Sequence, residues 1–286
     1  MNEERAWVDE QWNNVQILYK VRSILYENRS EFQHTQIVDS YQYGRMLLLD
    51  GFVQTTEKDE FIYHEMMVHV PMLSHPNPEK VLIIGGGDGG ILREVLRYGS
   101  VGGVTMVEID SKVIDLCQEY LPMISAGAFN DKRTNLVIDD GAEFVKETKD
   151  QFDVIIVDSP DPIGPARVLF SKSFYLTLHD IMTNHGILAR QTGSLHLQVD
   201  EQKEAYDLLT GIYSYTEPFV FAVPTYVGGF FSAMFSSDSI NPLDIGISAL
   251  EDRVVGNRLE TKYYHPGIHV GAFHVPRFLK ERLICQ

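Results

Sequence analysis

The sequence predicts an α/β protein in which a doubly wound parallel sheet follows a small antiparallel β domain. From Val81 onward, short apolar strands alternate with amphipathic helical segments, the pattern of βαβ units. The first of these strands runs directly into a glycine loop at residues 85–90, where nucleotide-binding sheets begin their first helix. Upstream of Val81, β-rich runs are separated by turn residues, which indicates antiparallel strands.

The N-terminal part contains three β-rich runs at residues 17–19, 35–38 and 45–49, separated by turn residues such as Asp50-Gly51. Residues 59–70 then predict a helix, because their apolar side chains recur near a period of 3.6 residues. We therefore expect an N-terminal β domain at residues 1–58. We expect residues 59–286 to form the catalytic domain, with an aromatic-rich C-terminal extension from Gly256 that packs back on the core.

The second part predicts five strands joined by helical segments such as residues 91–98 and 112–120. The expected strands are residues 81–84, 105–109, 136–138, 154–157 and 187–189. Ligands of such sheets bind beyond the carboxyl ends of the strands. Polar residues stand at or just after those ends, namely Asp88, Glu108, Asp140, Asp158 and Gln191.

Composition narrows the classes of protein that the chain can belong to. Of the 286 residues, 44% are hydrophobic, which is enough to bury a full core. The net charge of −16 disfavours binding of nucleic acid and favours binding of cationic partners. No run of about 18 apolar residues exists and the N-terminal segment is charged, so we expect a cytoplasmic protein without a membrane contact. Cys117 and Cys285 form neither a zinc-type pair nor a disulfide framework.

The glycine loop carries a carboxylate that a phosphate-binding loop would avoid. Gly85, Gly87 and Gly90 have the spacing that allows close approach to a nucleotide, but Asp88 lies among them. A pyrophosphate ~4 Å from Asp88 would be repelled by roughly 4 kcal/mol at an intermediate dielectric. A nucleoside without phosphates and with a cationic tail fits better, as in S-adenosylmethionine or its decarboxylated form.

Three further acidic positions fit such a ligand. Glu108 ends a strand about twenty residues past the glycine loop, where an acidic side chain commonly binds the ribose hydroxyls. Asp140, or its neighbour Asp139, could hold the adenine amino group. Asp158 and Asp161 flank a proline in a stiffened loop and suggest amine binding, although one such acid alone is more often a turn or cap residue.

Taken together, these segments resemble the spermidine synthase family of polyamine aminopropyltransferases over nearly the whole chain. The resemblance implies a Rossmann-like core of the methyltransferase type, decarboxylated S-adenosylmethionine as co-substrate and no permanently bound cofactor or metal. It implies aminopropyl transfer to a diamine, with putrescine as the leading acceptor and agmatine, cadaverine or spermidine as alternatives. The matching segments are residues 30–33, 49–51, 56–65, 85–90, 107–110, 140–141, 158–165, 224–226 and 262–264.

The resemblance also implies roles for individual residues. Asp158, helped by Tyr63, would accept the proton of the attacking amine during an in-line displacement that releases methylthioadenosine. The acceptor channel would be lined by Tyr63, Asp161, Gln191 and Tyr226. The donor would be held, in addition to Asp158, by Gln33, His64, Gly85, Gly87, Asp88, Glu108, Asp140 and Gly141. The family commonly forms homodimers or homotetramers.

Two features leave alternatives open. Arg190 replaces a small residue that usually precedes the acceptor-site glutamine; it either packs away from the pocket or reaches inward, where it would favour intact S-adenosylmethionine. His64 and His69 resemble a zinc-protease motif but are five residues apart, so they do not share a helix face. A dinucleotide oxidoreductase and a polyamine-binding protein without catalysis are the remaining readings.

Overall fold

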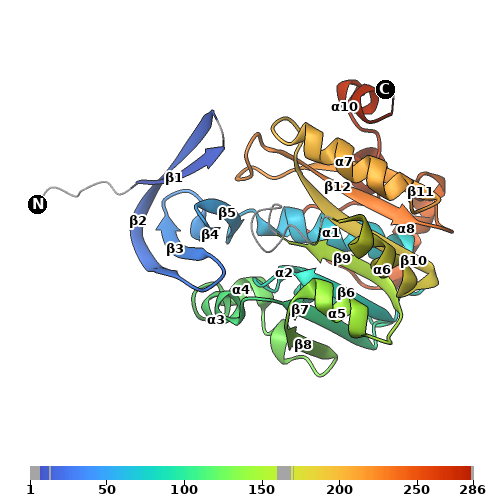
Figure 1. Ribbon diagram of the computed structural model, residues 1–286, viewed down its shortest axis with the longest axis horizontal. Helices are drawn as coiled ribbons and strands as arrows, with labels where there is room; N and C mark the ends of the chain where they lie inside the picture. The colour runs from blue at the N-terminus through green and yellow to red at the C-terminus, as the bar shows by residue number, and fades with distance from the viewer. Residues whose placement is uncertain (1–6, 13, 160–168, 170, 285–286) are drawn as a thin grey trace, which may run out of the picture.

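The computed structural model describes residues 7–12, 14–159, 169 and 171–284 and contains two β-sheets. The first is a five-stranded antiparallel sheet in chain order, which lies at one end of the molecule in Figure 1. Its strands are β1 (Trp7–Trp12), β2 (Val15–Arg29), β3 (His34–Ser40), β4 (Gly44–Leu49) and β5 (Phe52–Thr56).

The two faces of this sheet pack differently. Val38, Met46 and Val53 form a small apolar cluster of the sheet's own on one face. On the other face, Ile37 and Leu47 pack against the helices α3 (Ser111–Tyr120) and α4 (Pro122–Ser125) of the second part of the chain. The face of the first sheet that carries Ile37 and Leu47 therefore packs on the second part of the chain. This packing fixes the position of the first sheet relative to the larger one.

The second sheet has seven strands in the order β11-β12-β10-β9-β6-β7-β8. Five of them run parallel, as expected, while β12 pairs antiparallel with β10 and β11 pairs antiparallel with β12. The strands are β6 (Lys80–Gly85), β7 (Gly103–Glu108), β8 (Thr134–Ile138), β9 (Phe152–Asp158), β10 (Met182–Ser194), β11 (Tyr215–Ala222) and β12 (Phe230–Ser237).

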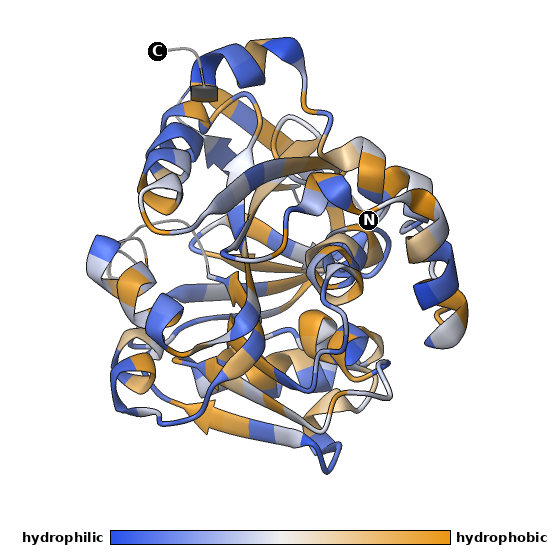
Figure 2. Cartoon of the chain, turned by 90° about the vertical axis from the view of Figure 1, so that its right-hand side faces the viewer, coloured by the Kyte–Doolittle hydropathy of each residue, from blue (hydrophilic) through white to orange (hydrophobic). Residues whose placement is uncertain are grey.

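Helices cover both faces of the larger sheet, because successive side chains of its inner strands point to opposite faces. Ile83 and Ile156 pack on the side of α1 (Glu60–Ser74) and α2 (Gly90–Val95), while Leu82 and Ile155 pack on the other side. In Figure 2 the hydrophobic residues run along the central strands, and the flanking helices mix hydrophobic and hydrophilic segments. The remaining helices are α5 (Gly141–Glu147), α6 (Lys172–Asp180), α7 (Val199–Thr210), α8 (Ile247–Gly256), α9 (Pro266–Ala272), α10 (Arg277–Ile284), and the short 3-10 turns η1 (Ala128–Asn130) and η3 (Pro242–Asp244).

The fold class expected from the sequence is confirmed, with one difference in detail. The antiparallel pair β11 and β12 was not expected; β11 contains Pro218, which is compatible with its position at the sheet edge. The aromatic C-terminal segment does return to the core, since Tyr264 and Phe273 are buried in the cluster around α1. None of the described helices is both long and apolar enough to span a membrane.

Candidate active site

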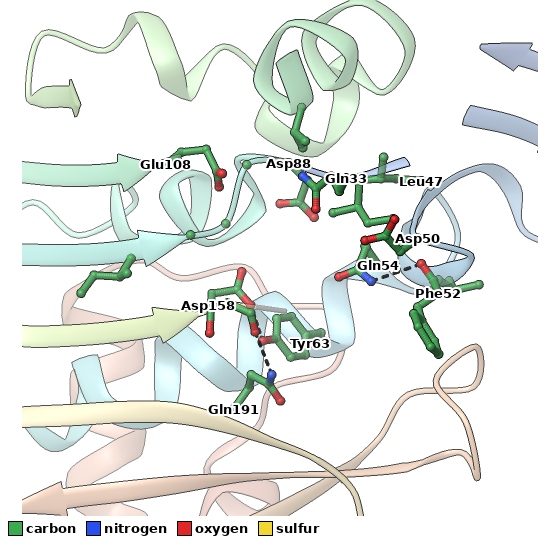
Figure 3. Close-up of a pocket in the computed structure, with 18 of the residues that line it drawn as sticks. Gln33, Leu47, Asp50, Phe52, Gln54, Tyr63, Asp88, Glu108, Asp158 and Gln191 are labelled. Carbon is green, nitrogen blue, oxygen red and sulfur yellow. Dashed lines mark hydrogen bonds between the residues drawn. The ribbon is translucent and has the colours of Figure 1, made fainter. Parts of the chain in front are cut away.

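A cavity of about 240 Å³ lies between the two sheets, at the carboxyl ends of the parallel strands (Figure 3). The glycine loop after β6 and the ends of β7, β9 and β10 form one wall, and strands β1, β4 and β5 of the first sheet form the opposite wall. Most residues predicted for the site line this cavity, namely Gln33, Tyr63, His64, Gly85, Gly87, Asp88, Glu108, Asp140, Gly141, Asp158, Gln191 and Tyr226. Asp161 lies outside the described residues.

The glycines of the loop allow close contacts that a side chain would prevent. A Cβ atom on Gly85 would lie 2.0 Å from the backbone oxygen of Asp158, and Gly85 also has a left-handed φ of +83°. A Cβ on Gly87 would lie 2.9 Å from Val113 on α3. A Cβ on Gly90 would lie 2.2 Å from the ring of His64. The loop is thus pressed against β9, α3 and α1, and this contact places Asp88 at the cavity wall.

Asp88 contacts the backbone of Gly90 and the ring of His64. Its Oδ1 accepts the backbone N–H of Gly90 at 2.8 Å, and its Oδ2 lies 3.2 Å from Nε2 of His64. Burial would raise the pKa of Asp88, but His64 and the Gly90 amide lower it below its usual range. Burial would lower the pKa of His64, but Asp88 and Glu60 raise it to about 10. At neutral pH the wall therefore presents an ionised carboxylate supported by an imidazolium.

Glu108 ends β7 and is buried at the cavity wall. Its Oε1 accepts the backbone N–H of Asp110 at 3.0 Å. Burial, together with the charges of Asp110 and Asp158, raises the pKa of Glu108 to about 7, despite the hydrogen bonds from the backbone. A carboxylate that is desolvated in this way gains from hydroxyl donors such as those of a ribose.

The loop that carries Gln33 is tied to the larger sheet through Asp110. Asp110 Oδ2 accepts from Ser30 Oγ at 2.7 Å and from Gln33 Nε2 at 3.1 Å, while its Oδ1 caps the N-terminus of α3. Asp110 was not among the predicted site residues. This bridge explains how Gln33, in the loop between β2 and β3, is held at the cavity wall.

Asp140 is the N-cap of α5 and Gly141 is its first residue, and both line the cavity. The Asp140 carboxylate accepts the backbone N–H of Ala142 at 2.7 Å, so it caps the helix. A Cβ on Gly141 would lie 2.6 Å from Ile84, so glycine is needed where α5 meets β6. Asp139, the alternative considered above, does not line the cavity; its carboxylate accepts the backbone N–H of Asp140 instead.

Asp158 and Tyr63 meet at the centre of the cavity (Figure 3). The Tyr63 hydroxyl donates to Asp158 Oδ1 at 2.5 Å. Burial and the charge of Asp88 raise the pKa of Asp158 to about 6, although the hydrogen bond from Tyr63 and the charge of His64 oppose the rise. Burial and the carboxylate raise the pKa of Tyr63 well above its usual value, so Tyr63 stays a neutral donor. Asp158 is thus poised to take up a proton near neutral pH.

Aromatic side chains pack around Tyr63. The ring centroid of Tyr226 lies 5.5 Å and that of Phe231 5.7 Å from Tyr63, both edge-on. The Tyr226 hydroxyl donates to the backbone oxygen of Gln54 at 2.6 Å, which joins β5 to the loop before β12. Ring faces and hydroxyls in this arrangement suit a flexible organic cation.

The neighbours Gln191 and Arg190 at the end of β10 point to different sides. Gln191 lines the cavity, and its Nε2 donates to the backbone oxygen of Ser159 at 2.8 Å. Arg190 is buried but is not among the cavity-lining residues, and its guanidinium carbon lies 5.3 Å from the ring centre of Tyr175 on α6. The expectation that Arg190 packs away from the pocket agrees with this position.

The sequence reasoning missed the contribution of β1. Glu10 and Trp12 both line the cavity, and Glu10 is 1% exposed. The Glu10 carboxylate accepts from the Tyr19 hydroxyl at 3.3 Å and from the Val53 backbone N–H at 3.2 Å. The alternation of residues in β1 places Glu10 on the same buried face as Val8, a signal that could have revealed an inward-facing carboxylate.

These observations define a class of protein: a Rossmann-like fold of the transferase type with an acidic pocket that suits a nucleoside without phosphates and with a cationic tail. Residues 60–244 match the family described as spermine/spermidine synthase domain, and residues 6–57 match the spermidine synthase tetramerisation domain. The chain therefore belongs to the spermine/spermidine synthase family, and it is a polyamine aminopropyltransferase.

Curated relatives and solved structures agree with this assignment. The chain is 44% identical to a polyamine aminopropyltransferase of Pseudomonas syringae pv. tomato over 91% of each chain, and 43% identical to one of Hamiltonella defensa over 99% and 98%. A crystal structure of spermidine synthase in complex with the transition state analogue AdoDATO has a TM-score of 0.94 and 38% identity, covering 100% of this chain and 97% of that one. Spermidine synthase from Thermotoga maritima has a TM-score of 0.90 and 38% identity, covering 99% and 95%.

Proposed function

We propose that the enzyme transfers the aminopropyl group of decarboxylated S-adenosylmethionine to putrescine, giving spermidine and methylthioadenosine. The observation that carries this proposal is the buried pair of Asp158 and Tyr63 at the centre of the cavity. In this proposal the nucleoside lies on the side of Asp88 and Glu108, and the acceptor amine lies on the side of Gln191 and Tyr226. The complex of a related spermidine synthase with the transition state analogue AdoDATO supports decarboxylated S-adenosylmethionine as the co-substrate.

On the donor side, each proposed contact pairs a charge or hydrogen-bonding group with its complement. Asp88 would bind the ammonium of the aminopropyl arm, and Glu108 the ribose hydroxyls. Asp140 and Gly141 would border the adenine, and Gln33 would close the nucleoside from the first sheet. The carboxylates of Asp88, Glu108 and Asp158 line the cavity and would repel an additional carboxylate, which supports a decarboxylated donor.

In the proposed reaction, the acceptor amine must first lose a proton, because a free alkylamine is almost wholly protonated at neutral pH. Asp158 would take that proton, and Tyr63 would orient the carboxylate. The amine nitrogen then forms a bond to the carbon next to sulfur, the carbon–sulfur bond breaks, and its electron pair stays on sulfur. The proton remains on Asp158 until solvent removes it. Alignment of nitrogen, carbon and sulfur supplies much of the acceleration.

On the acceptor side, we propose that Glu10 faces the distal ammonium of the diamine, at the end of the channel formed by Tyr226, Gln191 and Trp12. The resemblance of the chain to the family implies that Asp161 adds a second carboxylate there. A buried carboxylate at one end of a channel with apolar sides favours a short diamine whose two cations are separated by a methylene chain.

The acceptor is tested by initial rates with the diamines of three, four and five carbons, agmatine and spermidine, for the wild type and Glu10→Gln. We expect the highest kcat/KM for putrescine. In the variant, the KM for putrescine should rise about tenfold, because one contact with a charged group is lost. As a matched control, Glu79→Gln changes an exposed carboxylate far from the cavity. A higher kcat/KM for another amine would contradict putrescine, and an unchanged KM in the variant would contradict the role of Glu10.

We also propose that the protein assembles through its first sheet, as the tetramerisation domain match suggests. Trp7, Leu18 and Ile24 on β1 and β2 are each about half exposed, so this sheet has apolar side chains to bury between copies. Sedimentation should give a dimer or a tetramer, and Leu18→Glu should shift it toward the monomer. A wild-type monomer at micromolar concentration would refute the proposal.

A further inference from the structure

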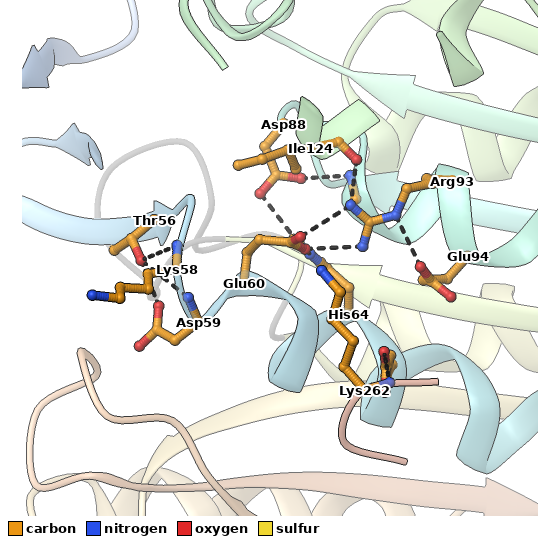
Figure 4. A network of polar contacts seen from close by, with 12 residues as sticks. Thr56, Lys58, Asp59, Glu60, His64, Asp88, Arg93, Glu94, Ile124 and Lys262 are labelled. Atoms are coloured by element: carbon orange, nitrogen blue, oxygen red, sulfur yellow. Dashed lines mark hydrogen bonds and ion pairs between the residues drawn. The ribbon is translucent and has the colours of Figure 1, made fainter. Parts of the chain in front are cut away.

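A chain of alternating charges runs from the cavity wall into the protein, behind Asp88. Asp88 contacts His64, and the other nitrogen of His64, Nδ1, lies 2.5 Å from Glu60 Oε2. Arg93 donates to both oxygens of Glu60, at 3.1 Å and 2.9 Å, and to the backbone oxygen of Ile124 at 2.6 Å. Figure 4 shows Glu60 between Arg93 and His64. Neither Glu60 nor Arg93 is among the residues that line the cavity.

The geometry determines the state of His64. A neutral imidazole carries one N–H, and only the protonated ring can donate from both nitrogens to two carboxylates. Burial and the close contact of the ring with Gly90 leave His64 little freedom to rotate. His64 therefore acts as a fixed cationic link between Glu60 and Asp88.

Removing the charge of Glu60 weakens the support of the hydrogen bond from His64 to Asp88. A glutamine at position 60 can still accept from Nδ1 of His64 through its amide oxygen. The contact that fixes the ring becomes weaker, because the amide carries no charge and one of the two atoms that accept from Arg93 becomes an NH2 group. The His64 donor to Asp88 Oδ2 would then be held less firmly, while the Gly90 amide stays in place.

We propose that Glu60, fixed by Arg93, is a positioning residue that holds the Asp88 carboxylate in the orientation that binds the ammonium of the donor. Glu60 does not touch the substrate and acts through His64. This inference rests on the proposed function, in which Asp88 contacts the aminopropyl arm. It assigns the specificity for the aminopropyl group partly to a residue behind the pocket wall.

The test compares two ligands that differ in the aminopropyl group. Calorimetry would measure the dissociation constants of decarboxylated S-adenosylmethionine and of methylthioadenosine for the wild type and Glu60→Gln. We expect the variant to bind the decarboxylated donor about tenfold more weakly, because this factor corresponds to the loss of one hydrogen bond to a charged group. Methylthioadenosine, which lacks the amine, should bind both proteins equally.

Glu65→Gln is a matched control, because Glu65 is also buried on α1 but accepts the backbone N–H groups of residues 262–264 instead of contacting His64. It should lower thermal stability and leave the ratio of the two dissociation constants unchanged. If Glu60→Gln does not fold, Arg93→Lys serves as a second variant, because it keeps the positive charge but cannot donate to both oxygens of Glu60 in the same way. It should weaken binding of the decarboxylated donor by a smaller factor and leave binding of methylthioadenosine unchanged.

A double-mutant cycle separates positioning from a general structural effect. In an Asp88→Asn background, Glu60→Gln should have no further effect on donor binding, since Glu60 acts through Asp88. Equal weakening of both ligands, no weakening, or a donor-specific loss that persists without Asp88 would overturn the inference. Failure of the wild type to bind the decarboxylated donor more tightly than methylthioadenosine would instead refute the proposed function, whatever the variants do.

Discussion

The hydrogen bond from Tyr63 to Asp158 predicts how the pH profile of the enzyme responds to a single hydroxyl group. The pKa of Asp158 is about 6, and Tyr63 is one of the groups that keep it from rising further. Tyr63→Phe removes the donor and leaves the aromatic ring among its neighbours Tyr226 and Phe231. The carboxylate then loses stabilisation relative to the carboxylic acid, so its pKa must rise.

The size of the change follows from the hydrogen bond. A hydrogen bond to a charged group is worth roughly 1.5–3 kcal/mol, and one pH unit corresponds to about 1.4 kcal/mol. The acidic limb of kcat/KM should therefore move from near pH 6 to roughly pH 7–8 in the variant. At pH 7 this lowers the ionised fraction of Asp158 about two- to tenfold, and much of the lost activity should return by about pH 9.

The assay is the ratio of kcat/KM for variant and wild type between pH 6 and 9, because ionisation of the acceptor amine affects both enzymes equally and cancels. Tyr226→Phe is the matched control: its hydroxyl donates to Gln54 instead of Asp158, so its acidic limb should stay near that of the wild type. A ratio for Tyr63→Phe that is constant over this pH range would refute Tyr63 as the residue that tunes Asp158.

Three other predictions concern stability. Gly85→Ala should destabilise the fold by about 2 kcal/mol or more and lower kcat, because its Cβ would lie 2.0 Å from the backbone of Asp158 at a left-handed φ; an unchanged melting temperature would contradict this. Glu65→Gln should cost about 1.5–3 kcal/mol in urea unfolding, since its carboxylate accepts three backbone N–H groups, and a loss below about 0.5 kcal/mol would argue against that anchor. The pKa of His64 is about 10 in the folded protein and about 6.5 in the unfolded chain. The protonated ring should therefore stabilise the fold fully below pH 6.5, and this stabilisation should be lost as the pH rises through 10. The stability of His64→Gln should not show this pH dependence, and an identical pH dependence in the two proteins would refute the prediction.

Periodic patterns made much of the fold predictable. The parallel strands read as continuous apolar runs because both of their faces are buried, and the polar residues that follow them gather at one edge of the sheet. Asp88, Glu108 and Asp158 could be placed together for that reason alone. Their individual roles, and that of Asp161, remain predictions.

The contributions that were missed depend on contacts between distant segments. The alternation in β1 indicates that Glu10 points inward, but its entry into this cavity depends on how the first sheet lies against the second. Arg93 reaches Glu60 across 33 positions of the chain, and Asp110 reaches Gln33 across 77. No periodicity of the sequence encodes such pairs, so they could only be found in the folded structure.

The measurement that tests the central claim most directly is mass spectrometry of the products that the purified enzyme forms from decarboxylated S-adenosylmethionine and putrescine, in the wild type and in Asp158→Asn. We predict equal amounts of spermidine and methylthioadenosine from the wild type, and no turnover but continued methylthioadenosine binding in the variant. Turnover only with intact S-adenosylmethionine, or full turnover by Asp158→Asn, would contradict the account.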